Sequence, residues 1–352
     1  MNIIKLDVML KKAEFFVRIE DKRVRCTLCQ RECLISTGKR GFCGVRVNID
    51  GVLKTLIYGE VAYIAVSPIE KKPFFHFYPG STWLSLGTLG CNFKCPGCQN
   101  WDIAHKVPET MEESDIIPEC NYFTPEDVIN AAKKYNCLGI SWTYNEPTIW
   151  FEFAYETSRR AKKEGLLSNY VSNGFISPLA IDTIAPYLDA IRIDIKGFSK
   201  STYKKIAHID DFKGILSIAE RVKRKHGIHL EIITNLIPQI NDNENELKGI
   251  AKWIKQKLGS ETPWHITRFY PACKLSHIPP TPISLLERTR ELAIKTGLEY
   301  VYLGNVPQHP FENTYCPHCG KILIERHSIS ILKNYLKRKI CPFCGGKIEI
   351  IL

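Results

Sequence analysis

The 352-residue sequence predicts an α/β fold in which a parallel β-sheet carries the functional site, with a smaller cysteine-rich segment on either side. The first indication is an alternation of short apolar runs with helical patterns through the middle of the chain. These runs are rich in β-branched residues, as expected for strands that are buried on both faces. A strand–helix order repeated this often predicts a parallel sheet, open or curled into a barrel, with the active site at the carboxyl ends of its strands.

Seven strands are predicted in this central part. They are Trp83–Leu86, Leu138–Trp142, Asn169–Ser172, Ala190–Ile195, His229–Thr234, His265–Phe269 and Tyr300–Leu303.

The helices between these strands have recognisable ends. Thr124-Pro125 and Ser177-Pro178 each combine an N-cap residue with a proline that suits the first helical turn. Two further helices are delimited by a capping box from Ser284 to Glu287 with a terminating Gly297, and by an Asp242 or Asn243 cap for Glu244–Leu258 with a terminating Gly259.

Composition divides the chain into three predicted domains, which are a cysteine-rich N-terminal lobe over 1–80, the α/β part over 81–308 and a C-terminal segment over 309–352. Within the first, alternating Val45–Ile49 and Val52–Leu56 flank Asp50-Gly51, which predicts a β-hairpin with a tight turn.

The use of cysteine indicates metal chemistry in a reducing compartment. Of the 14 cysteines, 11 fall in three tight clusters, which is typical of metal or iron–sulfur ligation. The start of the chain lacks a secretory pattern and no apolar run reaches the roughly 20 residues of a membrane helix. We therefore expect a cytoplasmic protein with no membrane association. The net charge of +11 favours anionic partners, although mixed signs along the chain also fit a solvated surface.

The three central cysteines, Cys91, Cys95 and Cys98, follow directly after the first strand of the α/β part. Three and two residues separate them, so three thiolates share one loop. Three thiolates can ligate three irons of a 4Fe–4S cube and leave the fourth iron open to a substrate or cofactor. A structural zinc site would need a fourth ligand, and no neighbouring cysteine or histidine supplies an obvious one.

This cysteine spacing resembles that of the radical S-adenosylmethionine (SAM) superfamily. The resemblance covers most of the chain and is closest to the radical SAM enzymes of the AmmeMemoRadiSam system, relatives of the pyruvate formate-lyase activating enzyme. The segments that carry it are Arg40–Arg46, Ile69–Pro73, Cys98–Trp101, Tyr144–Thr148 and Gly304–Pro307.

The resemblance implies a partial (βα) barrel of radical SAM type and SAM bound at the open iron of a 4Fe–4S cluster. One electron from the cluster would cleave SAM to methionine and a 5′-deoxyadenosyl radical, which abstracts hydrogen from a substrate. A protein or peptide substrate, as for activating enzymes, and an electron donor such as ferredoxin or flavodoxin are also implied. Two alternatives remain open, namely radical SAM modification of RNA and a non-catalytic zinc or iron–sulfur scaffold or electron carrier.

The same resemblance implies SAM contacts at two strand ends. Glu146 stands where the superfamily receives the SAM ammonium, with Tyr144 and Asn145 in place of two glycines. The alternative for Glu146 is an acid at a helix N-terminus. Asn173 follows the third strand and would hydrogen-bond the ribose, or would form a turn before the next helix.

Charged residues on the fourth strand extend the implied SAM site. Arg192, Asp194 and Lys196 alternate with isoleucines and therefore share one face. In activating enzymes such a segment places the lysine at the SAM carboxylate and the aspartate at a ribose hydroxyl or at the lysine. The alternative is a structural ion pair.

One position departs from the family pattern. An aromatic residue usually precedes the third cluster cysteine and packs on adenine, but here the residue is Gly97. Phe93 or Trp101 would have to replace it, or the SAM site is weaker.

The N-terminal cysteines, Cys26, Cys29, Cys33 and Cys43, suffice for a closed zinc site or for a second, fully ligated iron–sulfur cluster. The spacing does not choose the metal, and a structural zinc is slightly favoured. Basic residues around these cysteines would offset thiolate charge, and they are Arg23, Arg25, Arg31, Lys39, Arg40 and Arg46.

The C-terminal cysteines, Cys316, Cys319, Cys341 and Cys344, form two Cys-x-x-Cys-Gly motifs with 21 residues between them. This pattern predicts a structural zinc ribbon. Its surface is expected to be basic, which would fit nucleic acid or simply balance the metal–thiolate charge. The basic residues in question are Arg326, Lys333, Lys337, Arg338 and Lys339.

Isolated residues of reactive types are expected to be structural. Cys120, Cys137 and Cys273 stand apart from the clusters and are expected to be buried or incidental thiols. His265 and His309 could reach the site, but each is expected to be a hydrogen-bonded structural histidine.

Overall fold

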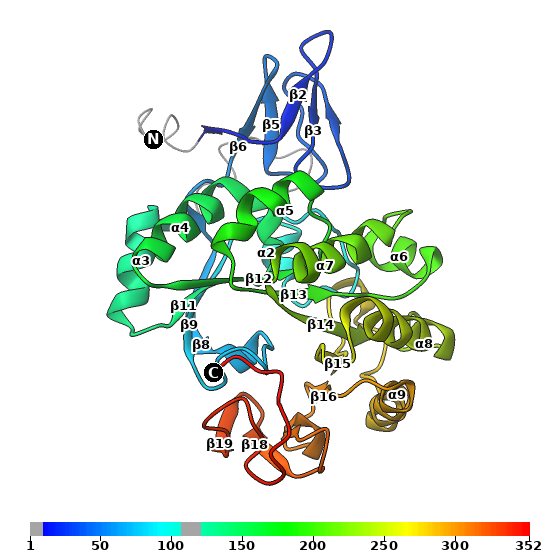
Figure 1. The fold of residues 1–352 in the computed structure, drawn as a ribbon. Coiled ribbons are helices and arrows are strands. Elements are labelled where there is room, and N and C mark those ends of the chain that lie inside the picture. The colour runs from blue at the N-terminus through cyan, green and yellow to red at the C-terminus, as the bar shows by residue number, and fades with distance from the viewer. Residues whose placement is uncertain (1–9, 107–120) are drawn as a thin grey trace. The chain divides into compact units, whose positions relative to one another are not determined.

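The computed structural model describes residues 10–106 and 121–352, and these form two compact units (Figure 1). The first unit takes its residues from 1–66 and 83–189, and the second from 67–82 and 190–352. Cys120 lies outside the described residues.

The first unit combines small antiparallel sheets with parallel strands. In the N-terminal part β5 (Arg46–Ile49) and β6 (Val52–Thr55) form the predicted hairpin. Its turn residues Asp50 and Gly51 have φ angles of 50° and 82°, as a tight hairpin turn requires. The other short strands here are β1 (Lys11–Lys12), β2 (Phe16–Arg18), β3 (Val24–Cys26), β4 (Leu34–Ile35), β7 (Glu60–Val61), β8 (Tyr63–Pro68) and β10 (Asn121–Tyr122).

Parallel strands position the central cysteines. β11 (Gly139–Trp142) pairs in parallel with both β9 (Thr82–Gly87) and β12 (Leu167–Ser172). Helix α4 packs on β11 and β12 (Figure 1). The helices and single turns of this unit are α2 (Trp101–Ala104), α3 (Pro125–Lys134), η4 (Pro147–Trp150), α4 (Phe151–Lys163), α5 (Pro178–Ile184) and η5 (Ala185–Tyr187).

The second unit continues the strand–helix alternation. β13 (Ala190–Asp194), β14 (His229–Leu236), β15 (Trp264–Arg268) and β16 (Val301–Gly304) pair in parallel in chain order. Its helices and turns are η1 (Ile69–Lys71), α6 (Lys200–Ala207), α7 (Lys213–His226), α8 (Glu244–Trp253), a π-helical turn (Ile254–Leu258), η7 (Cys273–Leu275), α9 (Ile283–Thr296) and η8 (Pro310–Glu312).

The predicted α/β fold is confirmed, with largely parallel strands that do not close into a barrel within the described residues. Most predicted helix ends are also confirmed. Thr124, Ser177 and Asn243 each accept a hydrogen bond from a backbone N–H of the first turn of α3, α5 and α8. No described helix is long and apolar enough to cross a bilayer.

The predicted capping box at Ser284 is wrong. Helix α9 begins at Ile283 with Pro282 as its N-cap, and no side chain caps it. Proline fixes φ near the value of the extended cap, so Ile283 takes the first helical position. Ser284 then already has helical geometry and cannot act as the cap. The predicted end at Gly297 is confirmed, with a φ of 100°.

A buried carboxylate ties residues 67–82 to the sheet of the second unit. The Glu231 side chain on β14 accepts hydrogen bonds from the backbone N–H groups of Phe75 and His76, at 3.0 and 2.8 Å. It also bonds the rings of His229 and His265, at 2.9 and 2.6 Å. His265 is therefore a structural histidine, as predicted.

The C-terminal ribbon consists of β17 (Thr314–Tyr315), β18 (Ile322–His327) and β19 (Ser330–Asn334), paired antiparallel. Figure 1 shows it in orange and red at the C-terminal end. Its buried Cys316 and Cys341 share an apolar cluster with Tyr300 and Tyr302 of the neighbouring β16 region. The ribbon is thus part of the core of the second unit.

Candidate cofactor and metal sites

The central cysteines lie on the loop that leaves β9. Gly90, just before Cys91, has a φ of 81°, in the left-handed region that glycine adopts without strain. The Phe93 N–H points at the Cys91 sulfur, 3.4 Å away, and the Cys98 N–H donates to the Cys95 carbonyl at 3.2 Å. Backbone donors thus help to set the positions of these thiols.

Electrostatics link this loop to Glu146. Burial raises the pKa of the Cys91 thiol well above its ordinary value, and the Glu146 carboxylate and the Cys95 and Cys98 thiols raise it further. A bound cation would remove this penalty, because it stabilises the thiolate. The donor set of three soft thiolates fits an iron–sulfur cluster.

The Glu146 carboxylate is buried and oriented by four donors. Its Oε1 accepts from the Thr148 N–H at 3.0 Å, the Thr148 hydroxyl at 2.6 Å and the Ser172 hydroxyl at 2.8 Å. Its Oε2 accepts from the Asn173 N–H at 2.7 Å. Glu146 therefore caps the one-turn helix η4, which agrees with the alternative prediction of an acid at a helix N-terminus. Because a carboxylate oxygen has about two acceptor positions, Oε2 keeps the capacity for one further donor.

Asn173 connects the third strand to the cysteine loop. Its Nδ2 donates to Oδ1 of Asn92 at 2.7 Å, and its Oδ1 accepts from the Phe175 N–H at 2.9 Å. The structure therefore brings Glu146, Asn173 and the central cysteines together in the first unit. Asn92, which the sequence analysis did not single out, joins them.

Asparagines also tie the end of β11 to the loop. Asn145 donates to the Gly90 carbonyl at 2.7 Å and accepts from the Thr88 N–H at 3.2 Å. Asn100, after the last loop cysteine, donates to the Tyr144 carbonyl at 2.5 Å. Neither asparagine was predicted, because nothing in the local sequence distinguishes these contacts from ordinary turns.

Tyr144 keeps the backbone conformation that glycine favours. Its φ is 74°, in the left-handed region. The side chain lies against Gly87, where a Cβ would come within 3.0 Å of the Tyr144 ring and Cβ, and packs on the Tyr63 ring at a centroid distance of 4.6 Å. Packing of its side chain thus accommodates Tyr144 at a position where the superfamily has glycine.

The two aromatic residues proposed to replace the one missing at Gly97 differ in availability. Phe93 is buried and packs on Phe175 at a centroid distance of 5.3 Å. Trp101, at the start of α2, is 51% exposed. Of these two side chains, Trp101 is the one left to contact a ligand.

The other predicted SAM contacts belong to the second unit. Asp194 lies between two cations, with Arg192 Nη2 and Lys196 Nζ each 3.5 Å from one of its carboxylate oxygens. Arg192 is buried and also donates to the Lys72 carbonyl. The charges on this strand are paired as the structural alternative predicted, and both Asp194 and Lys196 remain partly exposed.

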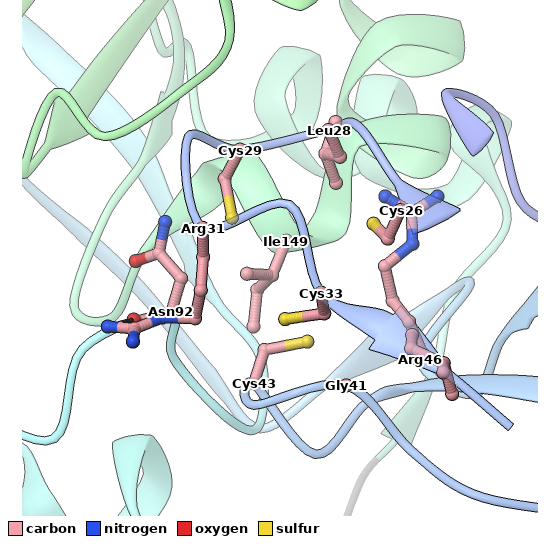
Figure 2. A pocket seen from close by; sticks show the side chains of 11 residues that line it. Cys26, Leu28, Cys29, Arg31, Cys33, Gly41, Cys43, Arg46, Asn92 and Ile149 are labelled. Atoms are coloured by element: carbon pink, nitrogen blue, oxygen red, sulfur yellow. Dashed lines mark hydrogen bonds between the residues drawn. The ribbon is translucent and has the colours of Figure 1, made fainter. Parts of the chain in front are cut away.

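The N-terminal cysteines line a pocket in the first unit, with an empty volume of about 350 Å³ (Figure 2). Cys26 ends β3, and Figure 2 shows the four sulfur atoms turned toward the enclosed space. Burial raises the pKa of Cys29 to about 12 and that of Cys43 to about 11. Of the predicted basic neighbours, Arg31 and Arg46 line the pocket.

The C-terminal cysteines have the spacing of a single-ion site. The sulfurs of Cys316 and Cys344 are 3.7 Å apart, and those of Cys319 and Cys341 are 3.8 Å apart. Gly320 and Gly345 have φ angles of 72° and 75°, which close the two turns. Across residues 10–106 and 121–352, this is the one group of three or more Cys, His, Asp or Glu ligand atoms that lie within 4.8 Å of one another.

One of the basic residues predicted for the surface of the ribbon is not on that surface. Arg326 is buried, and it donates to the carbonyls of Phe75 and Glu312 and to the Thr314 hydroxyl. Its guanidinium lies 3.8 Å from the Glu70 carboxylate. Phe75 and Glu70 are far away in sequence, so the local charge pattern could not reveal that they bury Arg326.

The isolated residues are structural or peripheral. Cys137 is buried and Cys273 is partly buried. His309 accepts from the Phe311 N–H at 3.2 Å through Nδ1, and its Nε2 lies 3.2 Å from Glu287. His309 is therefore a structural histidine, as predicted.

Comparisons of sequence identify the superfamily. The family model of the radical SAM superfamily matches residues 86–254, the segment that begins just before the central cysteines. An uncharacterised protein of Methanocaldococcus jannaschii is 43% identical over 345 residues, which cover 97% of this chain and all of that protein. A second protein of this organism, provisionally named a glycyl-radical enzyme activating enzyme, is 24% identical over 63% of this chain and 79% of its own length.

One solved structure shows the same fold at low identity, and a second gives only a partial alignment. A radical SAM methyltransferase from Sphaerobacter thermophilus aligns with a TM-score of 0.50 at 14% identity, over 65% of this chain and 68% of that protein. A domain of a pyruvate-formate lyase-activating enzyme from Bacteroides vulgatus aligns with a TM-score of 0.42 at 15% identity, over 47% of this chain and 99% of that domain.

Proposed function

Because this chain belongs to the radical SAM superfamily, and is on that account an enzyme that uses a 4Fe–4S cluster and SAM, we propose that it generates a radical on a protein or peptide substrate. The observation that carries this proposal is the loop of Cys91, Cys95 and Cys98, in which the Cys91 thiol lies close enough to the buried Glu146 carboxylate for that charge to raise its pKa. The bound cluster would supply the electron that cleaves SAM to a 5′-deoxyadenosyl radical.

Glu146 and Asn173 have separate tasks in this proposal. Glu146 would receive the SAM ammonium through Oε2, whose remaining acceptor position is held in place by the Asn173 N–H. Asp194 and Lys196 would contact the ribose and the SAM carboxylate. An exchangeable electron donor of the ferredoxin or flavodoxin class would reduce the cluster.

The choice of a protein or peptide substrate rests on the activating-enzyme relatives. The M. jannaschii protein named as an activating enzyme aligns with more than half of this chain. RNA is the second candidate, supported by the net charge of +11. Binding to RNA that weakens steeply with salt would favour RNA, whereas salt-independent binding would count against it.

The test of the proposal is the SAM-cleavage reaction. The chain is reconstituted with iron and sulfide without oxygen, reduced in the presence of SAM, and assayed for 5′-deoxyadenosine. Cys95→Ala should make no product above background, because one of three cluster ligands is lost. Cys273→Ala, which removes a cysteine outside the clusters, serves as the control and should match the unsubstituted chain. Equal product from Cys95→Ala would reject the proposal.

A further inference from the structure

The sulfurs of the N-terminal cysteines are spaced more widely than those of four cysteines that bind a single metal ion. Four thiolates around one zinc, each about 2.3 Å from the metal, bring every pair of sulfurs to roughly 3.8 Å. The C-terminal cysteines meet this condition, with sulfur pairs at 3.7 and 3.8 Å. The N-terminal cysteines do not, because within the described ranges no three of their sulfurs lie within 4.8 Å of one another. They line a pocket together with Arg31, Arg46 and Asn92 instead.

The central cysteines have the same property. Their three sulfurs also fall outside the single-ion spacing in the described part of the chain. In an iron–sulfur cube each thiolate binds its own iron, and bridging sulfides lie between the irons, so the cysteine sulfurs stay well apart. The N-terminal cysteines therefore resemble the central cysteines, and differ from the ribbon, in lacking the spacing of a single-ion site.

Buried donors at the wall of the pocket have no acceptor in the described protein. The Arg46 side chain is 1% exposed, and its Nη2 donates to the Glu14 carbonyl and to Glu152. Its Nε and Nη1, and Nδ2 of the equally buried Asn92, lack a hydrogen-bond partner among the residues described. Leaving such donors unpaired in a buried place is unfavourable. Thiolate and sulfide sulfurs of a cluster accept hydrogen bonds of this kind.

We propose that the N-terminal cysteines bind a second 4Fe–4S cluster, with Cys26, Cys29, Cys33 and Cys43 each ligating one iron. Arg46 and Asn92 donate to its sulfurs. Because all four irons have protein ligands, the cluster has no open position and does not bind SAM. It is chemically distinct from the cluster of the central loop.

The proposed cluster adjoins that loop. Asn92 lines the pocket and directly follows Cys91, and Arg31, another lining residue, donates to the Asn92 carbonyl at 3.2 Å. The backbone of Gly90 approaches Cys43 so closely that a Cβ added at Gly90 would lie 2.8 Å from the Cys43 carbonyl oxygen. A ligand of the second cluster and the start of the central loop are thus in direct contact within the first unit.

The two sites can be separated by substitution. The variant Cys91→Ala/Cys95→Ala/Cys98→Ala is reconstituted with iron and sulfide without oxygen, and its iron, sulfide and zinc are measured. We expect about four irons and one zinc per chain, against about eight irons and one zinc in the unsubstituted chain. The electron paramagnetic resonance signal of the reduced variant should be the same with and without SAM. Cys273→Ala is the control and should keep about eight irons.

Several results would overturn the inference. These are two zinc ions and no iron in the triple variant, two irons instead of four, no metal in the N-terminal pocket, or a signal that shifts on adding SAM. If the triple variant does not fold, the reciprocal variant Cys29→Ala/Cys43→Ala decides the matter. It should keep about four irons whose signal does shift with SAM, and a full set of eight irons in it would reject the proposal. Metal content does not depend on SAM cleavage. The iron and zinc measurements therefore test the second cluster even if the chain does not cleave SAM.

Discussion

Hydrogen bonds of single side chains hold the cysteine loop against the strand ends. The Glu146 carboxylate takes its orientation from Thr148, Ser172 and Asn173, so the η4 turn and the end of β12 converge on one group. Burial raises the pKa of this carboxyl above its ordinary value, while the hydrogen bonds from the same residues act in the opposite direction. A cationic ligand would favour the ionised form.

Glu146→Gln should weaken the affinity for SAM by about tenfold or more, because a charge-assisted hydrogen bond is worth about 1.5–3 kcal/mol. Titration of SAM into the reconstituted chain, followed by electron paramagnetic resonance, measures this change. The exposed Glu164, which pairs with Lys133, offers the control Glu164→Gln, and that variant should bind SAM normally. Unchanged affinity in Glu146→Gln would remove this residue from the site.

Gly90→Ala should destabilise the first unit and reduce the iron retained by the central loop. The left-handed φ of 81° costs alanine about 1–2 kcal/mol, and the overlap of its Cβ with Val45 and the Cys43 carbonyl adds about 1–3 kcal/mol. Gly165→Ala is a matched control, because its φ is 75° but nothing lies within 4 Å of the new Cβ. The difference between the denaturation midpoints of the two variants measures the cost of the Cβ overlap apart from the cost of the left-handed φ. Equal midpoints would contradict the close approach of Gly90 to Val45 and Cys43.

The helices and strands show which parts of this fold a sequence can specify. The predicted strand Trp83–Leu86 lies within β9, and Ala190–Ile195 extends β13 by one residue, because short segments rich in apolar and β-branched residues are typical of strands. A cap at Asp242 or Asn243 was predicted because capping is local chemistry, and the structure has Asn243 in that position. The contact between Arg46 and Glu152 joins residues 106 positions apart, and no local pattern predicts it. The same limit hid Asn92 and the burial of Arg326.

Asn243→Ala should lower the free energy of unfolding by about 1 kcal/mol, because the side chain accepts from the Glu246 N–H at the start of α8. Ser284→Ala should change it by less than about 0.5 kcal/mol, because Ser284 does not cap α9. Equilibrium denaturation of both variants checks the pair. A larger loss for Ser284→Ala than for Asn243→Ala would mean that the assignment of the two caps is wrong.

Among the described residues, the sulfurs of the C-terminal cysteines have the spacing of a single-ion site, and those of the N-terminal and central cysteines do not. The sequence predicts all three groups to be metal ligands from their positions, and the motif around Cys91 indicated the superfamily. It could not choose the metal at the N-terminal cysteines, because ligand order along the chain does not determine sulfur–sulfur distance. That distance depends on how β3, the Gly41 turn and the following loop pack around the pocket.

Removal of zinc should destabilise the second unit, because Cys316 and Cys341 belong to its apolar core. A strong chelator should release about one zinc per chain and lower the melting temperature by at least about 2–4 °C. Cys319→Ser should lose the zinc without chelator, whereas Cys273→Ser should keep it. Full retention of zinc by Cys319→Ser would show that the ribbon does not bind the ion.

The contact of Gly90 with Val45 and Cys43 limits how far this chain can be shortened. A fragment cut to the matched segment, residues 86–254, would contain every central cysteine yet lack the wall against which their loop is seated. We therefore expect that versions of this protein cut to the family boundaries alone will fail to hold iron at the central cysteines.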